Sequence, residues 1–374
     1  MYEPPFTGNC TVVQEQLPEG VDELYIQIIF SILYIAVWSA AIVGNSLVLY
    51  VVIFGNVSLS VRSVFIGCLA VSDMLMSLTS LPVTAVSIFM REWIFPGFLC
   101  KLIGVFQGGS IFVSSFTLAA IAIDRCFLVR RPNKDIINYE RAINIVIGIW
   151  ILGYGLAMPI GIFSGAVRYP DTCGVFCEES WPDYDPETLQ SVQRRFYGLL
   201  VMLLQFGFPT IISTVCYILI ARVMNEQLKK RMGQSLLPES EQRLSKKRNR
   251  ANRMMVCMVC GLVIAWMPLN AINLYRDLGL KESTDGEEEQ SKWFSTLFAF
   301  SHVTAMLSAV VNPLIYSWFN PNFRSAVKQL FNGCTNKRGL ARGESEVRPL
   351  RDDIRLAPQK RRRASSVQAT EIHL

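Results

Sequence analysis

The sequence predicts an all-α membrane protein, a seven-transmembrane helix bundle with a short amphipathic eighth helix. Hydrophobic residues make up 51% of the chain and charged residues only 18%. Seven apolar windows are each long enough to cross a bilayer as a helix, and Asp73 is the one formal charge inside any of them. Basic residues gather in particular connections, as in polytopic proteins. The windows are 24–54, 64–89, 102–123, 142–167, 196–221, 254–275 and 293–323.

The distribution of Lys and Arg places the two ends of the chain on opposite sides of the membrane. Residues 1–24 contain five acidic residues and no basic one, whereas 222–253 contain ten basic and three acidic residues. Basic loops stay in the cytoplasm, so we expect an extracellular N-terminus and a cytoplasmic C-terminus at the plasma membrane. Asn9 begins a glycosylation sequon on the outer side. No basic segment with a cleavage site precedes the first window, so no removable signal peptide is expected.

These features predict four regions. Residues 1–24 are expected to form an extracellular tail and 25–319 the bundle. Residues 320–334 are expected to form an amphipathic helix along the inner leaflet, ending at Cys334, a candidate for palmitoylation. Residues 335–374 are charged and poor in aromatic residues, which predicts a disordered cytoplasmic tail.

The third window is expected to be the central helix of the bundle. Residues 102–123 carry no charge, yet polar residues such as Gln107 interrupt them. A helix that faces only lipid would avoid these side chains, whereas one packed among other helices can use them. Cys100 precedes this window and the Asp124–Arg125 pair follows it, which suggests a sensing end and a signalling end.

A carboxylate midway through the second window indicates a polar site inside the membrane. Asp73 needs a partner or a cation there, because an unpaired charge in a bilayer is costly. Ser114, Ser308 and Asn312 could supply neutral oxygens around it. We therefore expect an allosteric sodium site, and the alternative is a hydrogen-bonded knot that only packs helices.

The outer loops are acidic, and the cysteines near them suggest disulfides. Loop 164–195 has six acidic against three basic residues, and 277–292 has six against two. Together these loops would form an acidic vestibule above the bundle that attracts a cationic ligand. The usual excess of basic residues on the inner side of a membrane protein also explains the acidic outer loops. In an oxidising compartment, Cys100 is expected to pair with Cys177, with Cys173 as the rival. A Cys10–Cys173 bridge is a further candidate.

Signatures on successive windows resemble those of rhodopsin-like G-protein-coupled receptors over roughly residues 24–333. The resemblance implies a receptor in which Arg125, Tyr217 and Tyr316 rearrange to admit a heterotrimeric G protein. It also implies a pivot near Trp266 and Pro268, and contacts with arrestin and receptor kinases. The residues that carry the resemblance are Asn45, Asp73, Asp124-Arg125-Cys126, Trp150, Pro209, Tyr217, Ala265-Trp266-Met267-Pro268 and Asn312-Pro313-Leu314-Ile315-Tyr316.

A finer resemblance is to neuropeptide Y and neuropeptide F receptors, on Gln107, the stretch 177–182 that includes Glu178 and Glu179, Asn273, Asp277, and 302–306. It implies an amidated peptide ligand whose arginine pairs with Asp277, while Gln107 and Asn273 contact the amidated end. Asn273 and Asp277 are four residues apart and share a helix face, and a carboxylate can bind a guanidinium through two bonds. Pairing of Asp277 with Arg276 is the alternative, and His302 is expected only to line the pocket.

Two departures from the family pattern bear on signalling. Leu262 stands where the family usually has a phenylalanine, and Ala265 replaces a frequent cysteine. The inner end of the sixth window offers Arg248 and Arg250 instead of an acidic residue, so Arg125 is left with Asp124 as its partner. We therefore expect appreciable signalling without ligand.

The expected function is thus a receptor for an amidated neuropeptide of the Y/F type, with coupling to inhibitory G proteins implied by the resemblance. A receptor for another amidated or tachykinin-like peptide is the alternative. A light sensor is excluded because window 293–323 has no lysine for a Schiff base. An ion-coupled transporter lacks support because internal repeats are absent. No catalytic motif, cofactor motif or nucleic-acid signature is found, so the chain is not expected to be an enzyme.

Overall fold

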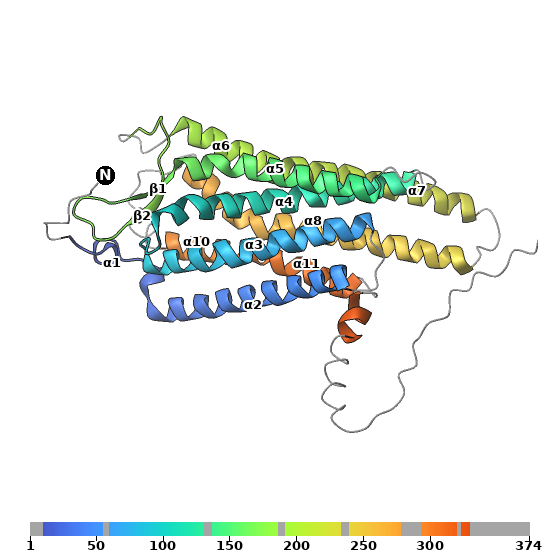
Figure 1. Ribbon diagram of the computed structural model, residues 1–374, viewed down its shortest axis with the longest axis horizontal. Coiled ribbons are helices and arrows are strands. Elements are labelled where there is room, and N and C mark those ends of the chain that lie inside the picture. The colour runs from blue at the N-terminus through green and yellow to red at the C-terminus, as the bar shows by residue number, and fades with distance from the viewer. Residues whose placement is uncertain are drawn as a thin grey trace, which may run out of the picture. The chain divides into compact units, whose positions relative to one another are not determined.

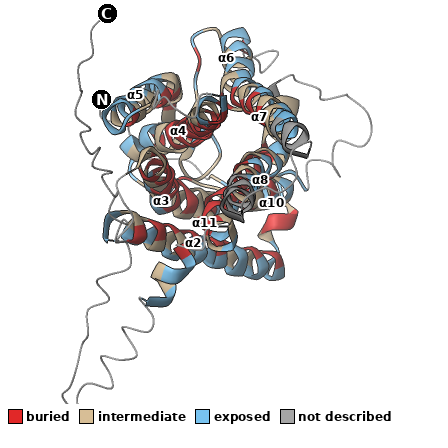
Figure 2. Cartoon of the chain, turned by 90° about the vertical axis from the view of Figure 1, so that its right-hand side faces the viewer, coloured by how far each residue is buried: buried red, intermediate tan, exposed pale blue. Residues whose placement is uncertain are grey.

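The structure, a computed structural model, describes residues 10–54, 60–130, 137–185, 191–232, 239–277, 293–319 and 323–329. They belong to one compact unit, 1–329. Within these residues seven helical rods are long and apolar enough to cross a membrane, which confirms the predicted bundle (Figures 1 and 2). The rods are α2 (Leu24–Phe54), α3 (Val61–Met90), α4 (Gly97–Arg130), α5 (Tyr139–Phe163), α6 (Val192–Met202) with η2 (Leu203–Gly207) and α7 (Phe208–Met232), α8 (Glu239–Asp277), and α10 (Phe294–Met306) with α11 (Ser308–Phe319).

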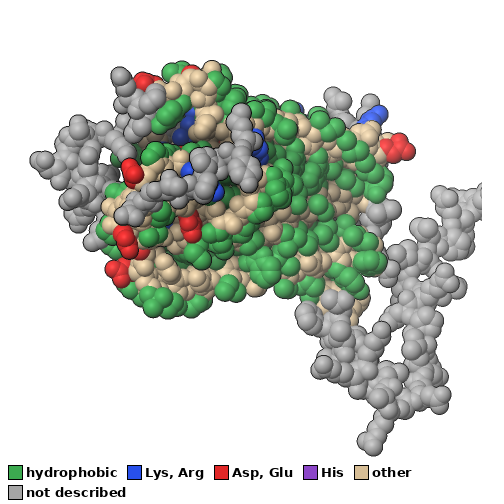
Figure 3. All heavy atoms as spheres, turned by 60° about the vertical axis from the view of Figure 1, so that its left-hand side comes forward, with side chains coloured by type: hydrophobic (Ala, Val, Ile, Leu, Met, Phe, Trp, Pro, Cys, Tyr) green, Lys and Arg blue, Asp and Glu red, His purple; other side chains and the backbone are tan. Residues whose placement is uncertain are grey.

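Helix α4 is the central helix, as its polar residues predict. In its most apolar stretch 67% of the residues are buried, against 11% in α5. It packs against α3, α5, α7 and α8. Figure 3 shows hydrophobic side chains over the flank of the bundle and charged side chains near its ends. Large apolar side chains on the outside suit a chain surrounded by lipid.

The fourth window is shorter than predicted. Helix α5 ends at Phe163, and the expected helical residues 164–167 instead form strand β1 (Ser164–Val167). This strand pairs in antiparallel fashion with β2 (Phe176–Glu179), with Ala166 opposite Cys177. A short apolar run does not by itself distinguish a strand from a helix, and here the pairing partner decides. The hairpin lies at one end of the bundle (Figure 1).

The seventh window is not one helix to residue 323. It breaks at Leu307 between α10 and α11, and α11 ends at Phe319. At the break the Val310 amide bonds to the Leu307 carbonyl at 2.9 Å, three residues back, a tighter turn than an α-helix has. Residues 323–329 are helical and correspond to the predicted amphipathic helix.

The described part of the N-terminal region, predicted as an extracellular tail, is folded. It contains α1 (Val13–Gln16) and η1 (Gly20–Asp22). A Cys10–Cys173 disulfide joins it to the loop between β1 and β2, and Thr11 forms an isolated parallel β-bridge with Thr172 of the same loop. Arg91, at the left-handed C-cap of α3, pairs with Glu19 at 2.7 Å and with Asp22 at 2.9 Å. The disulfide was a candidate from sequence, but the Arg91 pairs were not predicted, because they join residues about 70 positions apart.

Prolines shape the rods that carry the polar sites. The π-helical segment η2 ends two residues before Pro209, whose ring would collide with the carbonyl of Gln205 in a regular helix. Gln205 lies within this widened turn and is buried. Its Nε2 donates to the Gly108 carbonyl of α4 at 3.1 Å. Likewise Pro313 leaves the Ala309 carbonyl without an intrahelical donor.

Candidate functional site

The two disulfides define one end of the bundle, hereafter the disulfide end. Cys100 at the start of α4 is joined to Cys177 of β2, the pairing favoured over Cys173, which instead bonds to Cys10. Both cysteines of the hairpin region are thereby tied to other elements. The hairpin is held against α4, and the N-terminal segment is held against the hairpin.

A pocket of about 150 Å³ at the disulfide end brings together two of the predicted ligand residues. Glu179 of β2 and Asn273 of α8 both line it, with Arg194 and Tyr197 of α6. Glu179 accepts from Trp181 Nε1 at 3.0 Å and pairs with Arg194 at 3.4 Å. The pocket is also lined by Ile160, Gly198, Val201, Met202, Asn270, Leu274 and Arg276.

The charged side chains known to line this pocket are mixed in sign. Among the described residues, Arg194 and Arg276 line it together with Glu179, whereas most of the acidic loop 277–292 behind the predicted vestibule lies outside the described residues. A net count of residues in whole loops does not report which side chains face a given cavity. Arg194 and Tyr197 were missed because their window was judged for its apolar length, and Arg194 lies just outside it.

The structure places Gln107 and His302 outside the set that lines this pocket. His302 of α10 is buried, with its Nδ1 2.9 Å from the Tyr34 hydroxyl of α2 and its ring stacked on Phe298. Gln107 is half-buried on α4, next to the Gly108 carbonyl that Gln205 contacts. Gln205 could have been found as a polar residue within an apolar window.

Hydrogen bonds order the hairpin and the start of α6. Tyr169 donates to Glu178, and this bond, with the neighbouring negative charge, raises the pKa of Tyr169 to about 12. Ser191 donates to Asp183, which also accepts from the Gln193 amide at 2.9 Å. The Ser191 hydroxyl lowers the pKa of Asp183 below its ordinary value. The carboxylate of Glu178, a predicted ligand residue, thus accepts a hydrogen bond from Tyr169 of the same loop.

In the middle of the bundle, Asp73 of α3 contacts two of its three predicted neighbours, Ser114 of α4 and Asn312 of α11. Its two oxygens accept from Ser114 at 3.2 Å and from Asn312 Nδ2 at 2.9 Å, and Asp73 is only 3% exposed. Ser308, in contrast, accepts from Trp266 Nε1 at 3.0 Å. Asp73 and Ser114 thus bring a carboxylate and a hydroxyl oxygen together inside the bundle, while Asn312 presents its amide nitrogen to the carboxylate. Ser308 links this region to the tryptophan on α8.

The opposite end of the bundle, hereafter the Arg125 end, carries the predicted signalling residues. Arg125 Nη2 lies 3.5 Å from Asp124, the pairing expected from the sequence. Among the described residues, the buried hydroxyls of Tyr217 and Tyr316 have no protein hydrogen-bond partner. Arg250 of α8 donates to the Trp318 carbonyl of α11 at 3.0 Å.

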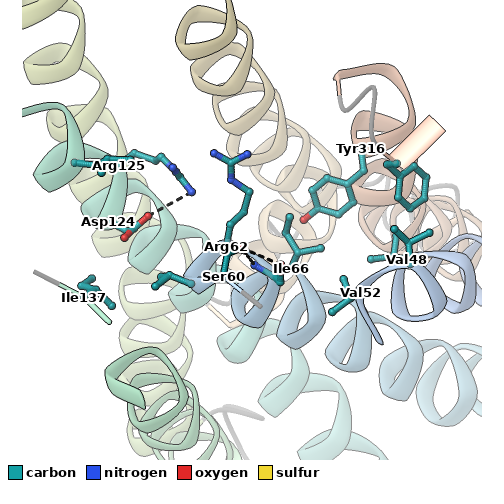
Figure 4. Close-up of a pocket in the computed structure, with 14 residues that line it drawn as sticks. Val48, Val52, Ser60, Arg62, Ile66, Asp124, Arg125, Ile137 and Tyr316 are labelled. Carbon is teal, nitrogen blue, oxygen red and sulfur yellow. Dashed lines mark hydrogen bonds and ion pairs between the residues drawn. The ribbon is translucent and has the colours of Figure 1, made fainter. Parts of the chain in front are cut away.

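A larger cavity, of about 420 Å³, opens at the Arg125 end (Figure 4). Arg125 and Asp124 of α4, Arg62 of α3 and Tyr316 of α11 all line it. Arg62 was missed because it lies just before the 64–89 window, where a basic residue suggests only the membrane boundary.

Several predicted sites lie wholly or partly outside the described residues. Asn9 and Cys334 are not described, and neither are the tail and most of the acidic loop before α10. Helix α8 ends at Asp277, whose backbone is described but whose side chain is not. Glycosylation, palmitoylation and the role of Asp277 therefore stay predictions.

Comparison with known proteins extends over most of the chain. A family model described as 7 transmembrane receptor (rhodopsin family) matches residues 44–316. Neuropeptide receptor 3 of Caenorhabditis elegans is 58% identical over 332 residues, 88% of this chain and 86% of that protein. Neuropeptide receptor npr-1 of the same organism is 30% identical, covering 88% and 78%. Neuropeptide Y receptor type 2 of Homo sapiens is 30% identical, covering 92% and 88%.

Proposed function

This chain belongs to the rhodopsin family of seven-transmembrane receptors, and on that premise we propose that it is a receptor for an amidated neuropeptide of the neuropeptide Y/F type. We further propose that it acts through heterotrimeric G proteins of the inhibitory class. Receptor function, as opposed to catalysis, follows from the family. The names of the relatives support the ligand class, and the geometry of the disulfide end supports the position of the ligand.

The observation that carries the proposal is the pocket in which Asn273 and Glu179 meet at the disulfide end. Asp277 lies one turn beyond Asn273 on α8. A peptide that inserts its amidated end toward Asn273 would bring an adjoining arginine to Asp277, where a charge-assisted bond is strong. Gln107, His302 and Glu178 complete the proposed ligand set from deeper in the bundle and from the hairpin.

Helix α8 connects this pocket with the rest of the bundle. It runs from Asp277 through Pro268 and Trp266 to Arg250. A ligand that binds better to a state with α8 displaced shifts the population toward that state. Displacement of α8 would change the bond from Trp266 to Ser308 and the surroundings of Arg125, Tyr217 and Tyr316. The Arg125 end is therefore the proposed contact surface for the G protein, and later for arrestin and receptor kinases.

The proposal includes an orientation. Disulfides form in oxidising compartments, so the end with Cys100–Cys177 faces the outside of the cell and the Arg125 end faces the cytoplasm. The basic segment 222–253 agrees with this placement at the plasma membrane. Asn9 would then be exposed to glycosylation, and Cys334 to palmitoylation at the inner leaflet.

We also propose that Asp73, with Ser114 and Asn312, holds an allosteric sodium ion. Each oxygen of the Asp73 carboxylate accepts one of these hydrogen bonds. A carboxylate oxygen has a second lone pair, which a cation could use. Such an ion would stabilise the arrangement in which Asn312 stays close to Asp73.

The ligand proposal is tested by a double-mutant cycle between Asp277 and the arginine of the peptide. Potency is measured as G-protein nucleotide exchange for the wild type and Asp277→Asn, each with an arginine-amide peptide and with the same peptide carrying neutral citrulline. If the charged pair forms, Asp277→Asn lowers the potency of the arginine peptide by about 10- to 150-fold. The citrulline peptide should then be nearly insensitive to the substitution, because the interaction has already been removed.

Asp171→Asn is the matched control. It removes a carboxylate at the same end of the bundle, and asparagine tolerates the left-handed backbone of Asp171 (φ 63°). The potency of the arginine-amide peptide at Asp171→Asn should remain at the wild-type level. Purely additive losses in the cycle would show that Asp277 does not pair with the peptide arginine.

A further inference from the structure

The cavity at the Arg125 end is built from four of the rods and the helix that follows them. Val48 and Val52 of α2, Arg62 of α3, Leu128 of α4 and Phe323 of the 323–329 helix are among the residues that line it. Its volume of about 420 Å³ lies in the range of sites for small ligands. Much of the wall is apolar, so the charged groups inside it are partly withdrawn from water.

The cavity contains more positive than negative charge. Among the described residues that line it, the charged side chains are Arg62, Arg125 and Asp124, which leaves a net charge of about +1. Figure 4 shows the guanidinium groups of Arg62 and Arg125 extending toward the same space from neighbouring helices. Asp124 pairs with Arg125. Two guanidinium groups in a partly desolvated space repel each other unless an anion compensates them.

Uncharged donors converge on the same space. Tyr316 is 2% exposed and points its hydroxyl toward Arg62 (Figure 4). Within the described part of the chain that hydroxyl has no protein partner, and neither do the Nε atoms of Arg62 and Arg125. The N-terminus of α3 opens here at Ser60, and the positive end of a helix dipole favours an anion. Arginine forks, a phenol and a helix N-terminus are the groups that bind a phosphate.

We propose that this cavity binds the phosphate of an anionic phospholipid, with Arg62 and Tyr316 as donors to the phosphate and Arg125 as its electrostatic partner. A lipid is the indicated source because the chain lies in a bilayer and the cavity is at one end of the rods. There the apolar side chains of Val52 and Phe323 can contact acyl chains while the arginines contact the head group. The bound phosphate supplies the negative charge that Asp124 alone does not.

The test uses the full chain in nanodiscs of phosphatidylcholine, with and without phosphatidic acid. Two readouts are taken, the thermal unfolding temperature and the number of phosphatidic acid molecules bound by native mass spectrometry. Arg62→Gln removes one guanidinium, and Arg222→Gln, at an exposed position on α7 outside the cavity, is the matched control. Tyr316→Phe removes only the hydroxyl. A third arm adds inorganic phosphate to nanodiscs of phosphatidylcholine alone.

Phosphatidic acid should raise the unfolding temperature of the wild type and of Arg222→Gln by the same amount. Arg62→Gln should weaken binding by at least about tenfold and abolish most of that rise. Tyr316→Phe should fold as well as the wild type without phosphatidic acid, because its hydroxyl has no protein partner to lose, and should show a smaller rise with it.

Three results would overturn the proposal. Equal rises in all four proteins would assign the effect to the general charge of the surface. The absence of any rise in the wild type would exclude the site. Saturation of the site by inorganic phosphate, with no further effect of phosphatidic acid, would exclude a lipid as the source of the phosphate. These readouts involve neither peptide nor nucleotide exchange, so they are independent of the proposed receptor function.

Discussion

At the scale of single residues, the contact between α2 and α11 depends on a glycine, an asparagine and a proline. Pro313 leaves the Ala309 carbonyl without its helical donor, and Asn45 of α2 supplies one at 2.9 Å. Asn45 also donates to Ala41 in its own helix at 2.9 Å. Gly44 allows this approach, because a Cβ atom there would lie 2.9 Å from the Cβ of Pro313. The resemblance had identified Asn45 and Pro313 as signatures, and the structure shows that they share one contact.

Gly44→Ala should therefore destabilise the protein by about 1–3 kcal/mol, because the helices must separate or shift. The measurement is the thermal unfolding temperature in detergent. Gly148→Ala on α5 is the matched control, since a Cβ there meets nothing within 4 Å. That variant should unfold at the same or a higher temperature, because alanine favours helix. If both variants behave alike, the approach at Pro313 is not a constraint.

Asp73 supports a second prediction at this scale, on the proposed sodium ion. Replacing choline chloride by sodium chloride at equal ionic strength should raise the unfolding temperature of the wild type, by about 2–4 °C for each kcal/mol of binding free energy. Asp73→Asn should lose this response. Ser77→Ala should keep it, because the Ser77 hydroxyl donates to the backbone carbonyl of Asp73 and not to the carboxylate. A response that survives in Asp73→Asn would place sodium elsewhere.

At the scale of elements, the N-terminal segment behaves as an additional folded element at the disulfide end. Arg91 joins it to the end of α3 through Glu19 and Asp22. The second oxygen of Glu19 accepts from the Ser295 amide of α10 at 2.9 Å, so one glutamate connects the segment with two rods. Because the Arg91 side chain is only 9% exposed, its loss would leave two partly buried carboxylates unpaired.

Arg91→Ala should therefore loosen residues 13–22 and the first turn of α10 while leaving α5 unchanged. Hydrogen exchange measured by mass spectrometry would report the loss of protection, and we expect the affected amides to exchange at least about tenfold faster. Lys101→Ala, an exposed basic residue at the same end, is the control and should leave protection unchanged. Unaltered exchange in Arg91→Ala would mean that the Cys10–Cys173 bridge alone holds the segment.

At the scale of the whole molecule, polar contacts occur at three levels of an apolar bundle. The pocket of Asn273 lies at the disulfide end, the Asp73 and Trp266 contacts lie in the middle, and Arg125 lies at the opposite end. Rods α8 and α10–α11 pass through more than one level. Movement of a rod at one level is therefore transmitted to the others, because packed helices do not deform locally.

Basal signalling is a property at this scale. Arg125 has Asp124 of its own helix as its ion-pair partner in the described structure, and Arg250 of α8 is engaged with Trp318 instead. Among the described side chains of α8 none is an acidic partner of Arg125, and the inner end of this membrane span carries Arg248 and Arg250 in sequence, so we expect measurable nucleotide exchange without ligand.

Arg248→Glu should supply such a partner and lower ligand-free exchange severalfold at equal surface expression, as an ion pair of about 1 kcal/mol would. Lys247→Glu makes the same charge change about 100° away around α8 and should leave basal exchange near the wild-type level. Equal effects of both variants would point to general surface charge, and a silent wild type would contradict the expectation itself.

Much of the fold could be predicted because a bilayer imposes a simple rule on sequence. A spanning helix needs about 20 apolar residues, and the window 24–54 coincides with α2. Within the seven windows the structure corrected ends and breaks, such as the strand at 164–167 and the interruption at Leu307. Both depend on local pairing and not on apolar length.

Less of the candidate site could be predicted. Asp73 could be identified from sequence because a charge inside an apolar window is conspicuous, and Asn273 because of the resemblance to neuropeptide Y and F receptors. Arg62 and Arg91 could not, because each is an ordinary basic residue at the end of a window. Their roles depend on which side chains approach from other helices.

The sequence by itself determined the class of the molecule, the number of its membrane spans and the family to which it belongs. Apolar length and ordered motifs are local properties of a chain and are readable without contacts. Only the tertiary structure decided that Ser308 binds Trp266 and not Asp73, that Glu19 holds Arg91, and that Arg62 shares a cavity with Arg125. These pairings join residues far apart in sequence, and the packing of the helices alone determines which of them meet.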